Sequence, residues 1–233
     1  MNAILLEHQT HEWQLMYNPA LSLDWVEAFI SGQQQTLDFE DYRLHDQPGN
    51  ALIESERGAA VVHQLSQRLW PWQTAQYVFE KYLIAQRTLE QRHITYATPL
   101  IFALKKQETV LNYDFIFLRS FVVGTPLEDY YLQHRALTPE LTSLAADVCL
   151  FLKKLARMGF RIEMLRACDI VYQNKQLVLA NWWRALPVQK AKSTRKSLPL
   201  ARFMLAWQKR VDYHDLFLES FRRINVDISL EID

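Results

Sequence analysis

The spacing of apolar and polar positions changes along the chain, and the changes predict its strands and helices. Residues 22–31 repeat apolar side chains four positions apart behind Ser22, which suits a helix N-cap, and they predict a short helix. Alternating apolar and polar residues predict three short strands after it, at 37–44, 51–55 and 59–65. The first part of the chain is therefore expected to be a helix followed by a small antiparallel sheet.

Longer helical patterns come next. Residues 73–91 contain no helix breaker and carry an apolar stripe at helical spacing, which predicts a long helix. Two further strands are predicted at 99–104 and 113–119. A second long helix is predicted from Thr138, a capping residue followed by proline and glutamate, to Gly159, which ends it.

Beyond residue 120 the pattern is mostly helical. The other elements predicted there are a short helix at 127–135, a hairpin with strands at 170–172 and 177–180, a polar basic loop at 186–198, a helix at 199–224 and an unanchored tail at 225–233. Strands with one long helix, followed mostly by helices, are typical of an α+β protein in two lobes. We predict a strand-rich lobe over residues 1–120, with a leading helix, a small antiparallel sheet and one long helix. A helical lobe with one hairpin is predicted over residues 121–233.

The composition fits a folded protein of this size. The chain has 233 residues, 49% of them apolar, which is enough to form a core in one domain or in two small lobes that share one. Cys149 and Cys168 match neither a disulfide framework nor a metal-ligand spacing, so we expect reduced thiols. The first residues lack the basic segment and apolar run of a signal peptide, and no apolar run approaches the roughly 20 residues that span a bilayer. We therefore expect a soluble cytoplasmic protein.

Charge is segregated along the chain, although the formal net charge is zero. Residues 1–60 hold ten acidic side chains and two arginines, whereas residues 170–211 hold nine basic side chains and no acidic one. Two interpretations remain open: two solvated faces that attract each other, or a basic surface for an anionic lipid headgroup, a phosphosugar or a nucleic acid. The lack of aromatic interleaving and of a nucleic-acid motif disfavours the last. The densest basic cluster consists of Lys190, Lys192, Arg195 and Lys196.

The most informative segment is 159–183, which reads GFRIEMLRACDIVYQNKQLVLANWW. The chain resembles the small bacterial kinase-like proteins in this segment and in four others: AAVVHQLSQRLW (59–70), VFEKYLIAQRTLEQRHI (78–94), YDFIFLRSFVVGTPLEDYY (113–131) and PLARFMLAWQKR (199–210). The nearest group is the lipopolysaccharide core kinases, which phosphorylate heptose or Kdo sugars. The resemblance extends over residues 36–224. It implies a protein-kinase-like fold with a strand-rich N-terminal lobe and a helical C-terminal lobe.

The catalytic loop of such kinases has a His-x-Asp sequence, an Asn five residues after the Asp, and a metal-binding Asp beyond a hairpin. By the resemblance, Ile162 stands at the His position and Met164 at the catalytic Asp. Asp169 stands at the Asn and Asn181 at the metal-binding Asp, so a carboxylate and an amide have changed places. A methionine thioether cannot accept a substrate proton at neutral pH. Glu163, one residue before Met164, is the candidate substitute base.

The resemblance also implies a vestigial nucleotide pocket. The phosphate-binding Lys of the third kinase strand falls near Val62 and His63, and its acidic partner on the next helix falls at Glu80. No glycine-rich phosphate loop precedes Val62. Asp169 and Asn181 offer oxygen ligands of the kind that suits Mg²⁺. The implied cofactors are ATP and Mg²⁺ if these five residues still bind them, and none if they do not.

Structural roles remain open for the same residues. Asp169 would then bridge a turn, His63 would be a buried core residue, and Glu80 would be a solvated helix side chain. Trp182 and Trp183 are expected to anchor the core or the lobe junction, with stacking on a ligand as the alternative.

Three functions remain open at this point. We favour a kinase-like protein without catalytic residues, a bacterial pseudokinase that binds or regulates and is linked by the resemblance to lipopolysaccharide biosynthesis. The second is an active ATP-dependent kinase for a lipopolysaccharide core sugar or another small substrate, with relocated catalytic groups. The third is an unrelated α+β adaptor with a basic binding face. The expected partner of the basic cluster is an anionic lipid or a lipopolysaccharide precursor at the membrane periphery, and not a nucleic acid.

Overall fold

The computed structural model describes residues 5–32, 50–68, 75–106, 112–186, 197–224 and 227–229. The chain divides into two compact units, the first comprising Met1–Glu80 with Ala97–Phe121 and the second Lys81–Tyr96 with Val122–Asp233. These units differ from the predicted lobes in one stretch, because residues 81–96 group with the second unit. The predicted lobe boundary near residue 120 stays a prediction.

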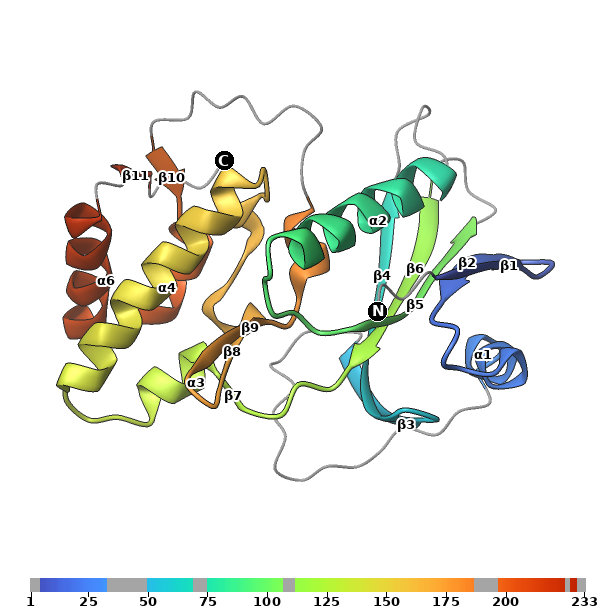
Figure 1. Ribbon diagram of the computed structural model, residues 1–233, viewed down its shortest axis with the longest axis horizontal. Helices are drawn as coiled ribbons and strands as arrows, with labels where there is room; N and C mark the ends of the chain where they lie inside the picture. Colours follow the sequence, from blue (N-terminus) through green and yellow to red (C-terminus); the bar gives the residue numbers. More distant parts are fainter. Residues whose placement is uncertain are drawn as a thin grey trace. The chain divides into compact units, whose positions relative to one another are not determined.

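One antiparallel sheet of six strands, in the order β1-β2-β5-β6-β4-β3, forms the basis of the first unit (Figure 1). Its strands are β1 (Leu6–Gln9), β2 (Trp13–Tyr17), β3 (Asn50–Ser55), β4 (Gly58–Arg68), β5 (Pro99–Lys106) and β6 (Asn112–Ser120). Four predicted strands are confirmed as β3, β4, β5 and β6, and the strand predicted at 37–44 lies outside the described residues. The hydrophobic pattern did not predict β1 and β2, which extend the sheet beyond β5.

Helix α1 (Leu23–Ile30) packs on one face of this sheet. Ser22 caps it as predicted, because the Ser22 hydroxyl oxygen accepts a hydrogen bond from the Trp25 N–H at 3.3 Å. Val26 and Phe29 are buried in the core between α1 and the sheet. The apolar spacing read from the sequence therefore identifies the face of α1 that is buried.

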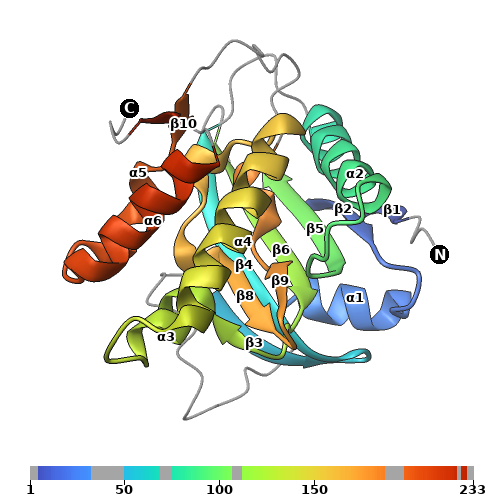
Figure 2. The same ribbon diagram turned by 60° about the vertical axis from the view of Figure 1, so that its left-hand side comes forward.

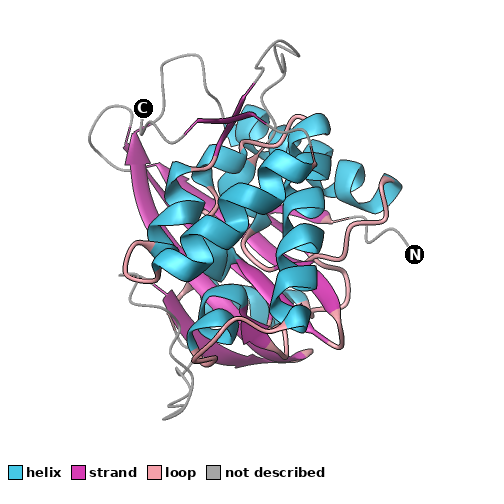
Figure 3. Ribbon diagram, turned by 90° about the vertical axis from the view of Figure 1, so that its left-hand side faces the viewer, coloured by secondary structure: helices cyan, strands magenta, loops and turns pink. Residues whose placement is uncertain are grey.

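The second unit is mainly helical, with its helices among those drawn in cyan in Figure 3, and it contains a small sheet in the order β7-β8-β9, which is labelled in Figure 1. Its elements are most of α2 (Ala75–Gln91), β7 (Thr125–Pro126), α3 (Leu127–Leu132), α4 (Pro139–Arg157), β8 (Ile170–Gln173), β9 (Gln176–Leu179), β10 (Ser197–Pro199), α5 (Ala201–Met204), a 3-10 turn (Leu205–Trp207), α6 (Val211–Arg223) and β11 (Asp227–Ser229). The predicted hairpin is confirmed as β8 and β9, and α3 is shorter than the helix predicted at 127–135. Across the described parts of the chain, no helix is long and apolar enough to cross a membrane.

Helix α4 begins and ends as predicted. The Thr138 hydroxyl oxygen accepts a hydrogen bond from the Leu141 N–H at 3.2 Å, and Pro139 occupies the first turn. Gly159 follows the helix with φ of 85°, a left-handed conformation that glycine adopts without strain. Helix α6 lies beside α4 (Figures 1 and 2).

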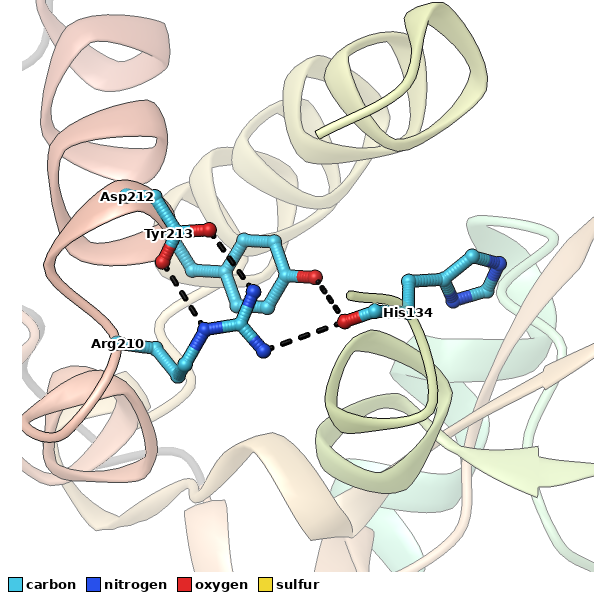
Figure 4. A network of polar contacts seen from close by, with 4 residues as sticks. All are labelled: His134, Arg210, Asp212 and Tyr213. Carbon is cyan, nitrogen blue, oxygen red and sulfur yellow. Dashed lines mark hydrogen bonds and ion pairs between the residues drawn. The ribbon is translucent and has the colours of Figure 1, made fainter. Parts of the chain in front are cut away.

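The prediction of one continuous helix at 199–224 is wrong, because the helical conformation is interrupted before α6. Arg210 has an extended backbone there, with φ of −131°. Its guanidinium makes two hydrogen bonds to the Asp212 carboxylate, at 3.1 and 2.8 Å, and lies 4.0 Å from the centre of the Tyr213 ring (Figure 4). Arg210 Nη1 and the Tyr213 hydroxyl both donate to the His134 carbonyl oxygen, at 3.2 and 2.8 Å. This network ties the start of α6 to the residues that follow α3.

The prediction of an unanchored tail at 225–233 is wrong for its described residues, 227–229, which form β11. Strand β11 pairs in parallel with β10, and the Lys153 ammonium donates to the Ile224 carbonyl oxygen at 2.7 Å. Strand β10 takes up the end of the loop predicted at 186–198, and residues 187–196 of that loop lie outside the described residues. The pairing joins segments about 30 positions apart, which no local pattern can reveal.

Candidate functional site

Residues 159–186, which we call the loop segment, belong to the second unit. The segment consists of the β8–β9 hairpin and three 3-10 turns, at Ile162–Met164, Ala167–Asp169 and Trp182–Ala185. The Arg161 N–H donates to the Ala185 carbonyl oxygen at 3.1 Å, so the two ends of the segment are bonded to each other. The Phe160 N–H donates back to the Leu155 carbonyl oxygen at 3.1 Å, which fixes the segment to the end of α4.

The first 3-10 turn holds the residues at the predicted base position. Ile162 is buried, and Met164 is half-buried. Glu163 Oε1 accepts a hydrogen bond from Arg161 Nε at 3.0 Å, and both side chains are partly exposed. The carboxylate considered as a substitute base is thus already ion-paired, and the side chain at position 164 has no proton acceptor.

The two residues predicted to hold a metal lie side by side. Asn181 Nδ2 donates to Asp169 Oδ1 at 2.7 Å, and the Arg166 N–H donates to Asp169 Oδ2 at 2.8 Å. The Ala180 N–H donates to the Asp169 carbonyl oxygen at 2.9 Å. Asp169 is 0% exposed, so its carboxylate is held entirely by protein groups.

Arg184 is a member of this cluster that the sequence reasoning missed. Its Nε lies 3.6 Å from Asp169 Oδ1, which makes an ion pair without a hydrogen bond. The guanidinium carbon lies 5.0 Å from the centre of the Trp183 ring, within the range of a cation–π contact. A local signal was present, because Arg184 follows Asn181 by three residues and a 3-10 turn brings such residues to one side.

Burial raises the pKa of the Asp169 carboxyl above its usual range. The Arg184 guanidinium opposes this most strongly, followed by the Asn181 amide and the Arg166 N–H. Because the raised pKa favours the protonated form in the folded state, the stability due to Asp169 is greatest at low pH. It is lost as the pH rises through the folded-state pKa.

The Asp169–Asn181 pair does not fit a magnesium ion. Both oxygens of the carboxylate already accept hydrogen bonds, and one of them also faces the Arg184 cation. Asn181 presents its donor nitrogen, not its oxygen, to the carboxylate. Among the described residues, no three acidic, histidine or cysteine side chains gather where they could hold a metal ion. Mg²⁺ usually needs one or two carboxylates that are free to coordinate it at roughly 2.0–2.1 Å.

The predicted pocket residues of the first unit point in different directions. Val62 on β4 is buried in the core under α1, whereas the ring of His63, on the opposite face, stacks with that of Phe117. Arg119 on β6 donates from Nε to His63 Nε2 at 3.3 Å, and both residues are buried. Glu80 is exposed on α2. A cation beside His63 is thus supplied by Arg119 on the neighbouring strand β6, which a search of β4 alone could not find.

Trp182 anchors the loop segment within the second unit. It is fully buried, and its ring makes edge contacts with Tyr82 of α2 and with Tyr96, at centroid distances of 6.2 and 5.9 Å. The Leu179 N–H also donates to the Thr95 carbonyl oxygen at 2.9 Å. Of the two roles predicted for Trp182, these contacts correspond to the core anchor.

Comparison with solved structures identifies the fold. The structure of WaaP in complex with acyl carrier protein matches with a TM-score of 0.54 and 14% sequence identity, over 84% of this chain and 82% of that chain. The chain has a kinase-like fold. The predicted α+β class is thus confirmed, and the resemblance to the lipopolysaccharide core kinases, the group of WaaP, is confirmed in fold. The hypothesis of an unrelated α+β adaptor is set aside.

A kinase-domain structure, that of Mycobacterium tuberculosis PknI, also matches, with a TM-score of 0.36 and 15% identity over 61% of this chain and 57% of that chain. This likeness is too distant to support an argument. No protein-family model matches the chain, and no curated protein matches it.

Proposed function

We propose that this chain is a pseudokinase, a kinase-like protein that binds or regulates without transferring phosphate. One argument carries the proposal: by the resemblance Met164 stands at the position of the catalytic base, and in the structure the neighbouring Glu163 is ion-paired with Arg161. A well-positioned general base contributes about 10²–10⁴-fold to the rate of a reaction. The rest of kinase catalysis is positioning and charge stabilisation, which depend on metal ions. The Asp169–Asn181 pair does not fit such an ion, so a second contribution is also missing.

The biological setting belongs to the same proposal. The kinase-like fold shared with WaaP supports a role linked to lipopolysaccharide assembly in a bacterial cytoplasm. WaaP has been observed in complex with acyl carrier protein, which makes an acyl carrier protein a candidate partner for this chain as well. ATP is proposed only as a ligand that binds without being turned over.

A thermal-shift titration with ATP tests this function. We expect that Mg²⁺ does not change the effect of ATP on the melting temperature, because the Asp169–Asn181 pair does not accept the ion. A site that bound ATP with a 100-fold excess over its Kd would gain about 2.7 kcal/mol of stability, which such a titration detects readily. Stabilisation by ATP only in the presence of Mg²⁺ would contradict the proposal. It would favour an active kinase that uses Glu163 or His63 together with Asp169 and Asn181.

We also propose that the basic cluster predicted from the sequence binds an anionic lipid or lipopolysaccharide surface. Its residues, Lys190, Lys192, Arg195 and Lys196, lie outside the described residues, so the charge pattern alone supports this part. Each basic residue near an anionic membrane contributes about 1 kcal/mol at low ionic strength, and salt screens the attraction. Binding is therefore expected to weaken steeply as salt is added.

Sedimentation with vesicles that contain anionic lipid measures this binding. Alanine at all four cluster positions should abolish it, whereas a control variant with alanine at four exposed arginines elsewhere should retain it. The control positions are Arg87, Arg92, Arg135 and Arg157. Binding that is equal at low and high ionic strength, or equally reduced in both variants, would count against a specific basic surface.

A further inference from the structure

The Asp169 carboxylate is buried in the loop segment, so neighbouring groups of the segment must stabilise it in place of water. It is fully buried, and three groups approach it: the Arg166 N–H at 2.8 Å, Asn181 Nδ2 at 2.7 Å and Arg184 Nε at 3.6 Å. The first two are neutral donors. Taking an ionised carboxylate out of water is costly unless a charge of opposite sign accompanies it. Two cations favour the ionised form, Arg184 and more weakly Arg166, and the ion pair within 4 Å is made by Arg184.

The position of Arg184 suits a permanent counter-charge. A guanidinium stays protonated throughout the physiological range, so its charge does not depend on its surroundings. The side chain is 16% exposed and lies over the Trp183 ring, which favours a cation that is partly removed from water. The 3-10 turn that carries Trp183 and Arg184 begins directly after Asn181, so the same turn sets the position of the amide and the cation.

The orientation of Asn181 agrees with this arrangement. Both Asp169 oxygens accept hydrogen bonds from N–H groups, the Arg166 N–H and Asn181 Nδ2, which is the way an ionised carboxylate is held. An asparagine that shared a metal ion with the carboxylate would turn its oxygen toward the ion. The pair is therefore arranged as donor and acceptor beside a cation.

We infer that Arg184 takes the electrostatic place of a divalent cation at the Asp169–Asn181 pair, so that this site is complete without metal and closed to it. The inference deepens the proposed function and rests on it for the absence of phosphate transfer. Arg184 is a positioning residue in this account. It holds the carboxylate and the amide of the loop segment in one arrangement, as a bound ion would in a metal-dependent site.

A double-mutant cycle tests the charge relationship. Arg184→Gln removes the main counter-charge of the buried carboxylate and is expected to lower the ratio of folded to unfolded protein by about a hundredfold at neutral pH. Adding Asp169→Asn to Arg184→Gln should recover at least about tenfold of that loss, because no unpaired buried charge remains. Arg184→Lys, which keeps the charge, should lose less than Arg184→Gln. The matched control is Arg161→Gln, whose partner Glu163 is partly exposed, and it should change the ratio by only a few fold.

The alternative is that Arg184 matters only for its packing on Trp183. In that case Arg184→Gln and the double variant would be equally unstable, and the inference would be overturned. Denaturant unfolding measures the wild type, these four variants and the single variant Asp169→Asn, which completes the cycle, without any nucleotide or turnover. A cycle without the predicted recovery would therefore overturn this inference and leave the proposed function standing. Phosphate transfer would overturn the proposed function, and such an enzyme could still give the predicted cycle.

A second measurement needs only the unmodified protein, in case a variant does not fold. Mn²⁺ broadens the NMR signals of groups close to it, and the Asn181 side-chain amide reports directly on the site. We expect these signals to keep their width when Mn²⁺ is added without nucleotide, and the melting temperature to stay the same. Saturable broadening of the Asn181 amide, with a Mn²⁺-dependent rise in melting temperature, would mean that the site accepts metal and that Arg184 does not replace it.

Discussion

Replacing Trp182 by alanine is expected to lower the free energy of unfolding by about 3–5 kcal/mol, the usual cost of truncating a large aromatic side chain in a core. The ring is fully buried and contacts Tyr82 and Tyr96 edge-on. Its removal leaves a cavity at the point where the loop segment joins α2 within the second unit. The loss should therefore exceed what the lost apolar area alone would give, because the surrounding elements cannot collapse fully.

Urea unfolding followed by circular dichroism measures this loss. Trp25→Ala is the matched control, because Trp25 is only partly buried and stacks on Phe29 at the surface of α1. We expect the control to lose less than half as much as Trp182→Ala, with similar slopes of the free energy against urea concentration in both variants. Equal losses would mean that Trp182 is not the anchor of the loop segment.

The elements with strong local signals could be predicted from the sequence. Helix α1 behind Ser22, and α4 between Thr138 and Gly159, begin and end where the caps indicate. Strands β1 and β2 could not be predicted, because β1 is short, polar and largely exposed, and β2 pairs with β5 almost 90 residues later. The break before α6 depends on Arg210 bonding to the His134 carbonyl, a contact between distant segments. Patterns within one segment carry no information on such pairings.

In the candidate site, too, some residues could be predicted from the sequence and others could not. The family resemblance brought out Asp169 and Asn181, and the structure brings their side chains into contact. The resemblance could not indicate that Asn181 donates to the Asp169 carboxylate, because the orientation of the amide depends on the fold around both residues. Arg184 and Arg119 were missed because the family's pattern directs attention to fixed positions, whereas a cation can reach the same neighbourhood from an adjacent turn or strand. The position of a charge in space, not its position in the motif, decides what it stabilises.

The second large effect concerns phosphate transfer itself. If Met164 stands at the base position, as the resemblance implies, and Glu163 is held by Arg161, the loop segment offers no free carboxylate there to deprotonate an acceptor hydroxyl. The loss of a general base, about 10²–10⁴-fold, combines with the loss of metal-based charge stabilisation. Kinases typically turn over at about 1–100 per second, so the loss of the base alone lowers the expected rate to about 10⁻⁴–1 per second, and the loss of metal-based stabilisation lowers it further.

Phosphorus NMR of ATP with stoichiometric protein and Mg²⁺, with and without purified lipopolysaccharide as acceptor, measures this rate directly. We predict that the ATP signals decay no faster than in buffer alone, and that Glu163→Gln, a variant that keeps the shape of the side chain, behaves in the same way. Formation of ADP well above the buffer rate, lost in Glu163→Gln, would establish Glu163 as a working base and contradict the account.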